Sequence, residues 1–70
     1  MPFVHIQLVG DNIADDPDAK KARIATKVVD AIHEETGAAK TSVWVVFEEV
    51  AAGDWFVGGA SVETLRKRRG

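Results

Sequence analysis

The chain has 70 residues, of which 46% are hydrophobic and 29% charged, and its formal net charge is −2. This composition is typical of one small folded domain covering residues 1–70. The absence of cysteine excludes disulfides and thiolate metal sites. No apolar stretch is long enough to cross a bilayer, and the start lacks the pattern of a signal peptide. We therefore expect a cytoplasmic protein, with neither a membrane nor nucleic acid as a partner.

The first segment, from Pro2 to Val9, predicts a strand because its hydrophobicity alternates with a period of two. One face of this strand carries His5 and Gln7, but also Phe3 and Val9, so that face is only partly polar. We expect something to cover it. The fully apolar face consists of Val4, Ile6 and Leu8.

A polar connector, residues 10–16, leads to a predicted helix from Pro17 to Thr36. Asp16 is a suitable N-cap acceptor and Pro17 suits the first helical position, while Gly37 is a natural C-cap. The apolar side chains recur at helical spacing, at Ala22, Ala25, Val28, Val29 and Ile32.

A second strand is predicted from Ser42 to Val50. Val45 and Phe47 share one of its faces, and Trp44 and Val46 share the other. Residues 52–54 resemble a turn, residues 55–59 a small hairpin, and residues 61–70 a polar, basic end.

Strand, long helix and strand make an α+β fold: a single β-α-β unit with parallel strands and a short C-terminal hairpin. A two-stranded sheet is marginal on its own. Its uncovered face would expose Phe3, Val9, Trp44 and Val46, so we predict an obligate oligomer in which other copies cover that face.

Pro2 is the most informative candidate for chemistry. Removal of Met1 would leave a secondary amine at the start of a strand, and apolar surroundings would lower the pKa of that amine towards neutrality. Such a group is a general base that needs no side chain. The alternative is that Met-Pro is a common start without functional meaning.

Several segments together resemble the 4-oxalocrotonate tautomerase family. They are the Met-Pro-Phe-Val-His-Ile start, the single long helix, Thr-Ser-Val at residues 41–43, and Gly-Asp-Trp-Phe-Val-Gly-Gly at residues 53–59. The resemblance implies a β-α-β fold, a homohexamer, and no cofactor or metal. It also implies that Pro2 is the base in keto-enol or double-bond isomerisation of a small oxo acid or related carbonyl compound.

The resemblance also implies substrate-binding positions. Trp55 takes the place of an aromatic residue that lines the pocket, and Val9 and Ser42 correspond to positions that border the substrate. Trp44 stands where relatives have an arginine, and another arginine position falls at Asp11 or Asn12.

The absence of these arginines predicts a less anionic substrate, or a cation supplied from elsewhere. Lys20, Lys21 and Arg23 are candidates for that cation, although the ordinary interpretation is a solvated helix face. Trp44 itself is expected at a pocket wall or an interface.

Two other functions remain open. One is a non-catalytic oligomeric binding protein on the same fold; the other is a hydratase- or dehalogenase-like relative that uses the proline as an acid. The basic run at residues 66–69 is interpreted as a frayed, solvated tail, or as cations over a neighbouring subunit. His5 and His33 lack metal-ligand spacing, and Glu48 and Glu49 must point to opposite faces of their strand.

Overall fold

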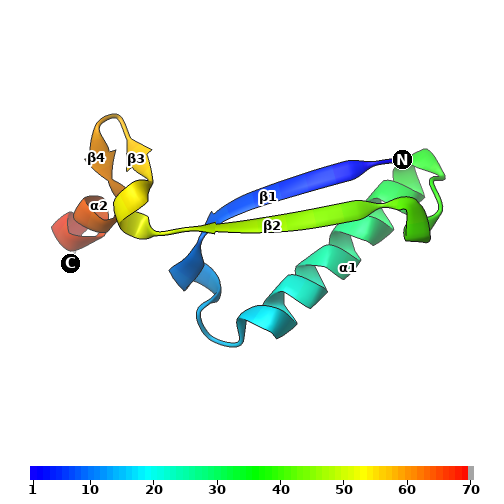
Figure 1. Cartoon of the computed structure of the whole chain (residues 1–70), viewed down its shortest axis with the longest axis horizontal. Coiled ribbons are helices and arrows are strands. Elements are labelled where there is room, and N and C mark those ends of the chain that lie inside the picture. The colour runs from blue at the N-terminus through cyan, green and yellow to red at the C-terminus, as the bar shows by residue number, and fades with distance from the viewer. Residues whose placement is uncertain (70) are drawn as a thin grey trace.

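The computed structural model describes residues 1–69 of the chain (Figure 1). Two strands and a long helix form the body, and a small hairpin and a short helix follow. Short 3-10 turns connect them. In chain order the elements are β1 (Phe3–Val9), η1 (Gly10–Ile13), α1 (Pro17–Thr36), η2 (Lys40–Ser42), β2 (Trp44–Val50), η3 (Ala52–Asp54), β3 (Phe56–Val57), β4 (Ala60–Ser61) and α2 (Val62–Arg69).

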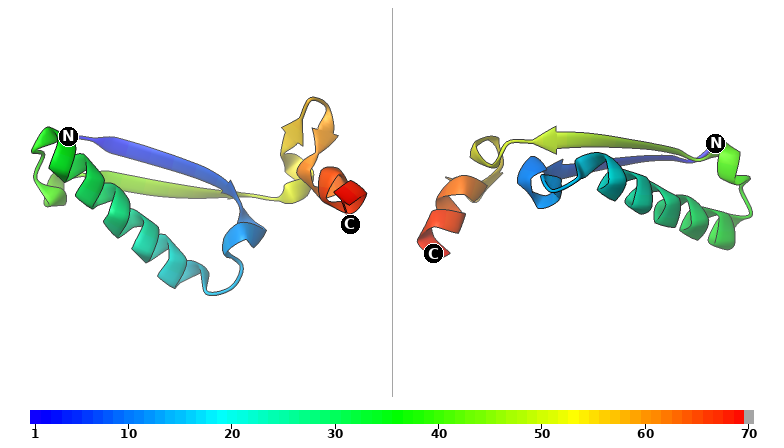
Figure 2. Two further views of the ribbon diagram at one scale, coloured as in Figure 1. Left: turned by 180° about the vertical axis from the view of Figure 1, so that it is seen from behind. Right: turned by 90° about the horizontal axis from the view of Figure 1, so that it is seen from below.

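Strands β1 and β2 pair in parallel, in a register that runs from Phe3 opposite Trp44 to Val9 opposite Val50. Helix α1 returns along one face of this ribbon and leaves the other face open (Figure 2). The predicted parallel β-α-β unit is therefore confirmed. The second strand begins later than predicted, because Ser42 belongs to the 3-10 turn that precedes it.

Helix α1 has the predicted bounds. Gly37 ends it in the left-handed region, with φ 75°, and its N–H donates to the His33 carbonyl at 2.9 Å. The prediction that the Asp16 side chain caps the helix was wrong. Asp16 has a left-handed backbone, with φ 58°, whereas a capping side chain needs an extended backbone at this position, and its side chain makes no capping bond.

The chain buries very little apolar surface on its own. Val9 and Ile13 are the buried hydrophobic residues of the described part. The radius of gyration is 15.2 Å, whereas a compact chain of this length would have about 11 Å. The accessible surface is 5028 Å², against about 4,300 Å² expected for a monomer of this mass. The fold is an extended platform rather than a closed globule.

The open face of the ribbon carries large apolar side chains. Phe3, Trp44 and Val46 are 61%, 55% and 42% exposed. Val9 was predicted on this exposed face, but it is only 7% exposed. The reason is its place at the end of β1, where the chain turns into η1 and contacts it. Ile13, in the connector predicted to be polar, is buried as well.

The basic run at residues 66–69 was interpreted as a frayed tail or as cations over a neighbouring subunit; the frayed tail was wrong, because residues 62–69 form helix α2. The Ser61 hydroxyl accepts a hydrogen bond from the Thr64 N–H at 3.1 Å, which caps the start of the helix. The hairpin and α2 lie beyond the ends of β1 and β2 (Figure 1). Gly70 lies outside the described residues.

Candidate functional site

The first group of predicted site residues lies where β1 begins. Pro2 is half-buried, and its carbonyl accepts the Trp44 N–H at 2.9 Å. Met1, which precedes it, is 87% exposed. The backbone nitrogen of Pro2 therefore lies at the edge of the molecule, behind a residue that makes little contact with the rest.

Ser42 and Trp44 belong to the same end. Ser42 is part of η2, and its hydroxyl donates to the Ala39 carbonyl at 2.7 Å, which leaves the oxygen's acceptor sites available. Trp44 pairs with Phe3 across the two strands, so both side chains face the open side of the sheet. We call Pro2, Ser42 and Trp44 the proline end.

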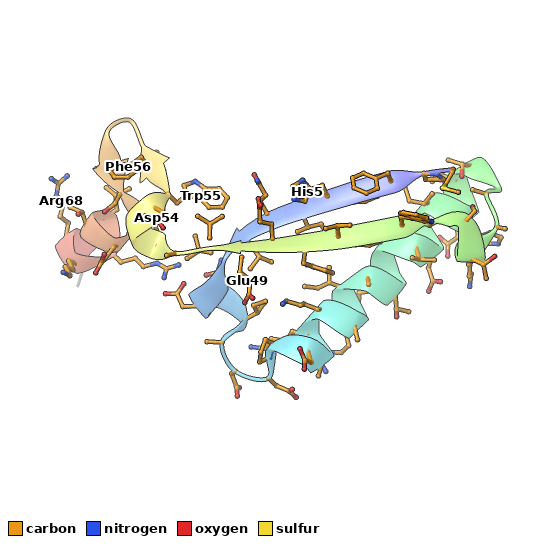
Figure 3. All side chains as sticks on the ribbon, viewed as in Figure 1. His5, Glu49, Asp54, Trp55, Phe56 and Arg68 are labelled. Carbon is orange, nitrogen blue, oxygen red and sulfur yellow. The ribbon has the colours of Figure 1, made fainter. Side chains whose placement is uncertain are left out.

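The second group lies at the opposite end of the ribbon. Val9 ends β1, and Trp55 follows η3, with its carbonyl accepting the Val62 N–H at 2.7 Å. Figure 3 shows Trp55 where the C-terminal hairpin meets the end of the strands. We call Val9 and Trp55 the Trp55 end.

A single chain does not bring these two ends together. From Pro2 to Val9 the chain runs along a strand, a distance of about 23 Å at ~3.3 Å per residue. The five predicted site residues therefore form two separate half-sites within one subunit.

Between the ends, the open face carries a small polar cluster. His5 Nε2 lies 3.8 Å from Glu48 Oε1, and the Gln7 amide donates to the same carboxylate. Glu49 points the other way, towards the helix, where Lys21 Nζ lies 3.3 Å from its Oε2 (Figure 3). The two adjacent glutamates thus face opposite sides, as predicted.

Two of the three cations expected on the helix, Lys21 and Arg23, have other neighbours in the single chain. Lys21 is paired with Glu49 between helix and sheet. Arg23 borders a shallow hollow, together with Ala22, Thr26 and Lys27, all on α1. Neither arrangement places a free cation beside Pro2 or Trp55.

Sequence reasoning named Arg66 only as part of a basic run and missed its contact with the η1 turn. Its guanidinium binds the Asp11 carboxylate and lies 3.0 Å from Asn12 Oδ1. Asp11 and Asn12 are the positions at which the resemblance led us to look for an arginine. Because 55 and 54 residues separate the partners, only the fold could reveal this contact.

A surface cavity of about 450 Å³ lies beside Arg66. Each cation that lines it has an acidic neighbour: Arg66 binds Asp11, and Lys67 Nζ lies 3.8 Å from Glu63 Oε1. The charged side chains of the lining therefore sum to zero. The remaining wall is formed by residues 51–53.

Within residues 1–69, no group of three potential metal-ligating side chains is present. His33 uses Nδ1 in a 2.8 Å hydrogen bond with the Ala38 carbonyl, beside the end of α1. In the same range, no helix combines the length and apolarity needed to cross a membrane.

Comparison with known proteins agrees with this architecture. A family model described as "Tautomerase enzyme" matches residues 2–65. This chain belongs to the tautomerase family. The search of curated proteins gave no match.

Solved structures of tautomerase homologues superpose on the chain over nearly its whole length. TomN, a 4-oxalocrotonate tautomerase homologue of the tomaymycin biosynthetic pathway, is 28% identical with a TM-score of 0.86, covering 99% of this chain and 100% of its own. DmpI from Helicobacter pylori is 30% identical with a TM-score of 0.84, covering 94% and 97%.

A third structure, from a study of the 4-oxalocrotonate tautomerase isozymes of Methylibium petroleiphilum, is 34% identical with a TM-score of 0.74. It covers 91% of this chain and 97% of its own. The tautomerase fold therefore extends through the C-terminal hairpin as well as the β-α-β body.

Proposed function

We propose that this tautomerase-family protein is a cofactor-independent isomerase whose base is the amine of Pro2 after removal of Met1. It moves a proton between carbon and oxygen, or between carbons, of a small oxo acid or related carbonyl compound. The observation that carries the proposal is Pro2 itself: it directly precedes β1 and follows the exposed Met1.

The chemistry follows from the protonation state of the amine. An unperturbed α-amino group has a pKa of ~8, and apolar surroundings lower the pKa because they disfavour the ammonium form. Phe3 and Trp44 supply apolar surface next to Pro2. A neutral amine near pH 7 can then abstract a proton from one position of the substrate and return it at another.

The pocket is proposed to form between subunits. Two half-sites about 23 Å apart along β1 cannot act on one small molecule, so the Trp55 end of one copy must meet the proline end of another. The open face, with Phe3, Trp44 and Val46 exposed, supplies apolar surface for such association. We propose a homohexamer, in keeping with the family resemblance.

The side chain of Trp44 affects how many acidic groups the substrate can carry. A tryptophan offers an apolar plane, whereas an arginine at the same position would grip a carboxylate with two hydrogen bonds. With Trp44 at the proline end and a charge-neutral cavity beside Arg66, a substrate with one acidic group, or none, fits better than a dianion.

The test is ketonisation of phenylenolpyruvate, followed by absorbance. Mass spectrometry first establishes that Met1 has been removed, because an amide nitrogen is not a base. We expect Pro2→Ala to lower kcat by about 100-fold, at the low end of general-base contributions. Pro17→Ala, which changes the other proline, should retain the rate.

The pH profile separates base from acid. For a base, the rate rises with pH as the ammonium loses its proton and then levels off; for an acid, it falls over the same range. Equal rates for the wild type and Pro2→Ala would remove Pro2 from the mechanism. Absence of any rate in the processed wild type would favour a non-catalytic binding protein.

A further inference from the structure

We infer that Arg66 is a positioning residue for Trp55: its bond to the η1 turn holds the C-terminal arm, residues 55–69, in place at the end of the ribbon. Trp55 matters as a pocket wall only within the proposed function. The mechanical claim, that Arg66 fixes the arm, can be measured without any substrate.

Arg66 is attached to the β-α-β body through two side chains. The Arg66 guanidinium binds the Asp11 carboxylate through Nη1, and its Nη2 donates to Asn12 Oδ1 at 3.0 Å. A planar guanidinium held by two adjacent side chains has a defined direction as well as a defined distance. Both anchor residues belong to η1, directly after β1.

The anchor is connected to Trp55 through helix α2. Arg66 lies on α2, and Val62, the first residue of that helix, donates its N–H to the Trp55 carbonyl at 2.7 Å. The Ser61–Thr64 cap fixes the start of the helix. Helix α2 also contacts η3, which directly precedes Trp55 in the sequence, and β4, which pairs with the strand after Trp55. A displacement of Arg66 therefore moves the backbone at Trp55.

Little else fastens the arm. Strands β3 and β4 have two residues each, and Phe56 and Val57 are 61% and 57% exposed. Among the side chains that the structure describes, Arg66 provides the hydrogen bonds and the ion pair that link residues 55–69 to residues 1–50. Apart from the contacts of α2 and β4 with η3, the arm is therefore attached to the body through this polar link.

A direct role for Arg66 in gripping an anion is the competing hypothesis. The geometry favours positioning, because two of the guanidinium's amino groups are already engaged and its charge is balanced by Asp11. The two roles differ in one respect: positioning requires opposite charges at 11 and 66, but not a cation at 66.

This difference defines the experiment. The variants are Arg66→Gln, the charge swap Asp11→Arg with Arg66→Asp, and Arg68→Gln as the matched control. Arg68 lies on the same helix, is exposed, and makes no ion pair among the described side chains. The readouts are hydrogen exchange of the Val62 amide by NMR, and kcat and KM for phenylenolpyruvate.

We expect Arg66→Gln to speed exchange of the Val62 amide by about two- to five-fold, the size expected for an exposed ion pair. KM should rise by a similar factor while kcat changes little, because Pro2 is untouched. The charge swap should restore both quantities, and Arg68→Gln should change neither. Circular dichroism checks that each variant is folded.

Unchanged exchange in Arg66→Gln would overturn the proposal, whether or not the protein is active. Restored exchange without restored KM in the charge swap would also overturn it, in favour of anion binding by Arg66. If the wild type isomerises nothing, the exchange measurement still decides whether Arg66 holds the arm. Failure of the Pro2 mechanism is thereby distinguished from failure of this proposal.

Discussion

The two faces of the β1–β2 ribbon differ in how much of their apolar surface the chain itself covers. Helix α1 covers one face, where Val45 and Phe47 are half-buried and Lys21 pairs with Glu49. The other face leaves Phe3 and Trp44 more than half exposed. A β-α-β unit has only one helix to cover a sheet with two faces. One chain therefore leaves this face of the sheet without a second layer, and the proposed association of copies would supply it.

The same contrast explains why the site is divided. The residues of the proline end and the Trp55 end are far apart along the ribbon of one chain. Under the proposed function, one event, the covering of the open face by another copy, would both add stability and complete the site.

The largest effect is expected from Val46→Asp, at the centre of the open face. If a second copy covers that face, an unpaired buried carboxylate there costs several kcal/mol, about 3–5 by the usual range for such groups. Sedimentation should show dissociation to monomers. Ala31→Asp, on the exposed side of α1, should leave the assembly intact. A fully assembled Val46→Asp protein would contradict the interpretation of this face as an interface.

A matched pair of truncations sharpens the comparison. Phe47→Ala, on the helix face, should lower the free energy of unfolding by about 2–3 kcal/mol, because its half-buried ring is lost. The loss should not depend on protein concentration. Trp44→Ala should weaken association instead, so its effect on the denaturation midpoint should shrink at low concentration. Chemical denaturation at two concentrations tests both, and identical concentration dependence would refute the distinction.

The smallest effect concerns the end of the covering helix. Gly37 has φ +75°, a conformation that costs a residue with a Cβ about 1 kcal/mol. Gly37→Ala should lower the melting temperature accordingly. Gly10→Ala is the control, since a Cβ there meets the nearest atom, Glu49 Oε1, at 3.6 Å, an ordinary contact. Equal losses in both variants would show that helix termination is not the cause.

Much of the fold was predictable because it depends on local patterns. Alternation defined β1, and helical spacing between Pro17 and Gly37 defined α1 with its correct bounds. The family resemblance rested on short segments spread along the chain, and the family match over residues 2–65 confirms it. The C-terminal hairpin was predicted because the short apolar segment at residues 55–59 ends in two adjacent glycines.

The errors lie where contacts between distant residues decide. Ile13 and Val9 are buried because η1 folds against the end of β1, and no periodicity of the sequence indicates this. The basic C-terminal segment is charged enough to suggest a solvated tail, yet it forms a helix held through Arg66 to Asp11. Of the site, Pro2, Val9, Ser42, Trp44 and Trp55 stay predictions.

By itself, the order of amino acids indicated the two long strands, the long helix between them and the apolar side of each. Those properties come from backbone preferences and side-chain spacing within a few residues. The tertiary structure alone decided that the two half-sites lie at opposite ends of one subunit, and that a guanidinium from α2 reaches the end of β1. Such facts depend on how distant segments pack, and spacing along the chain does not encode them.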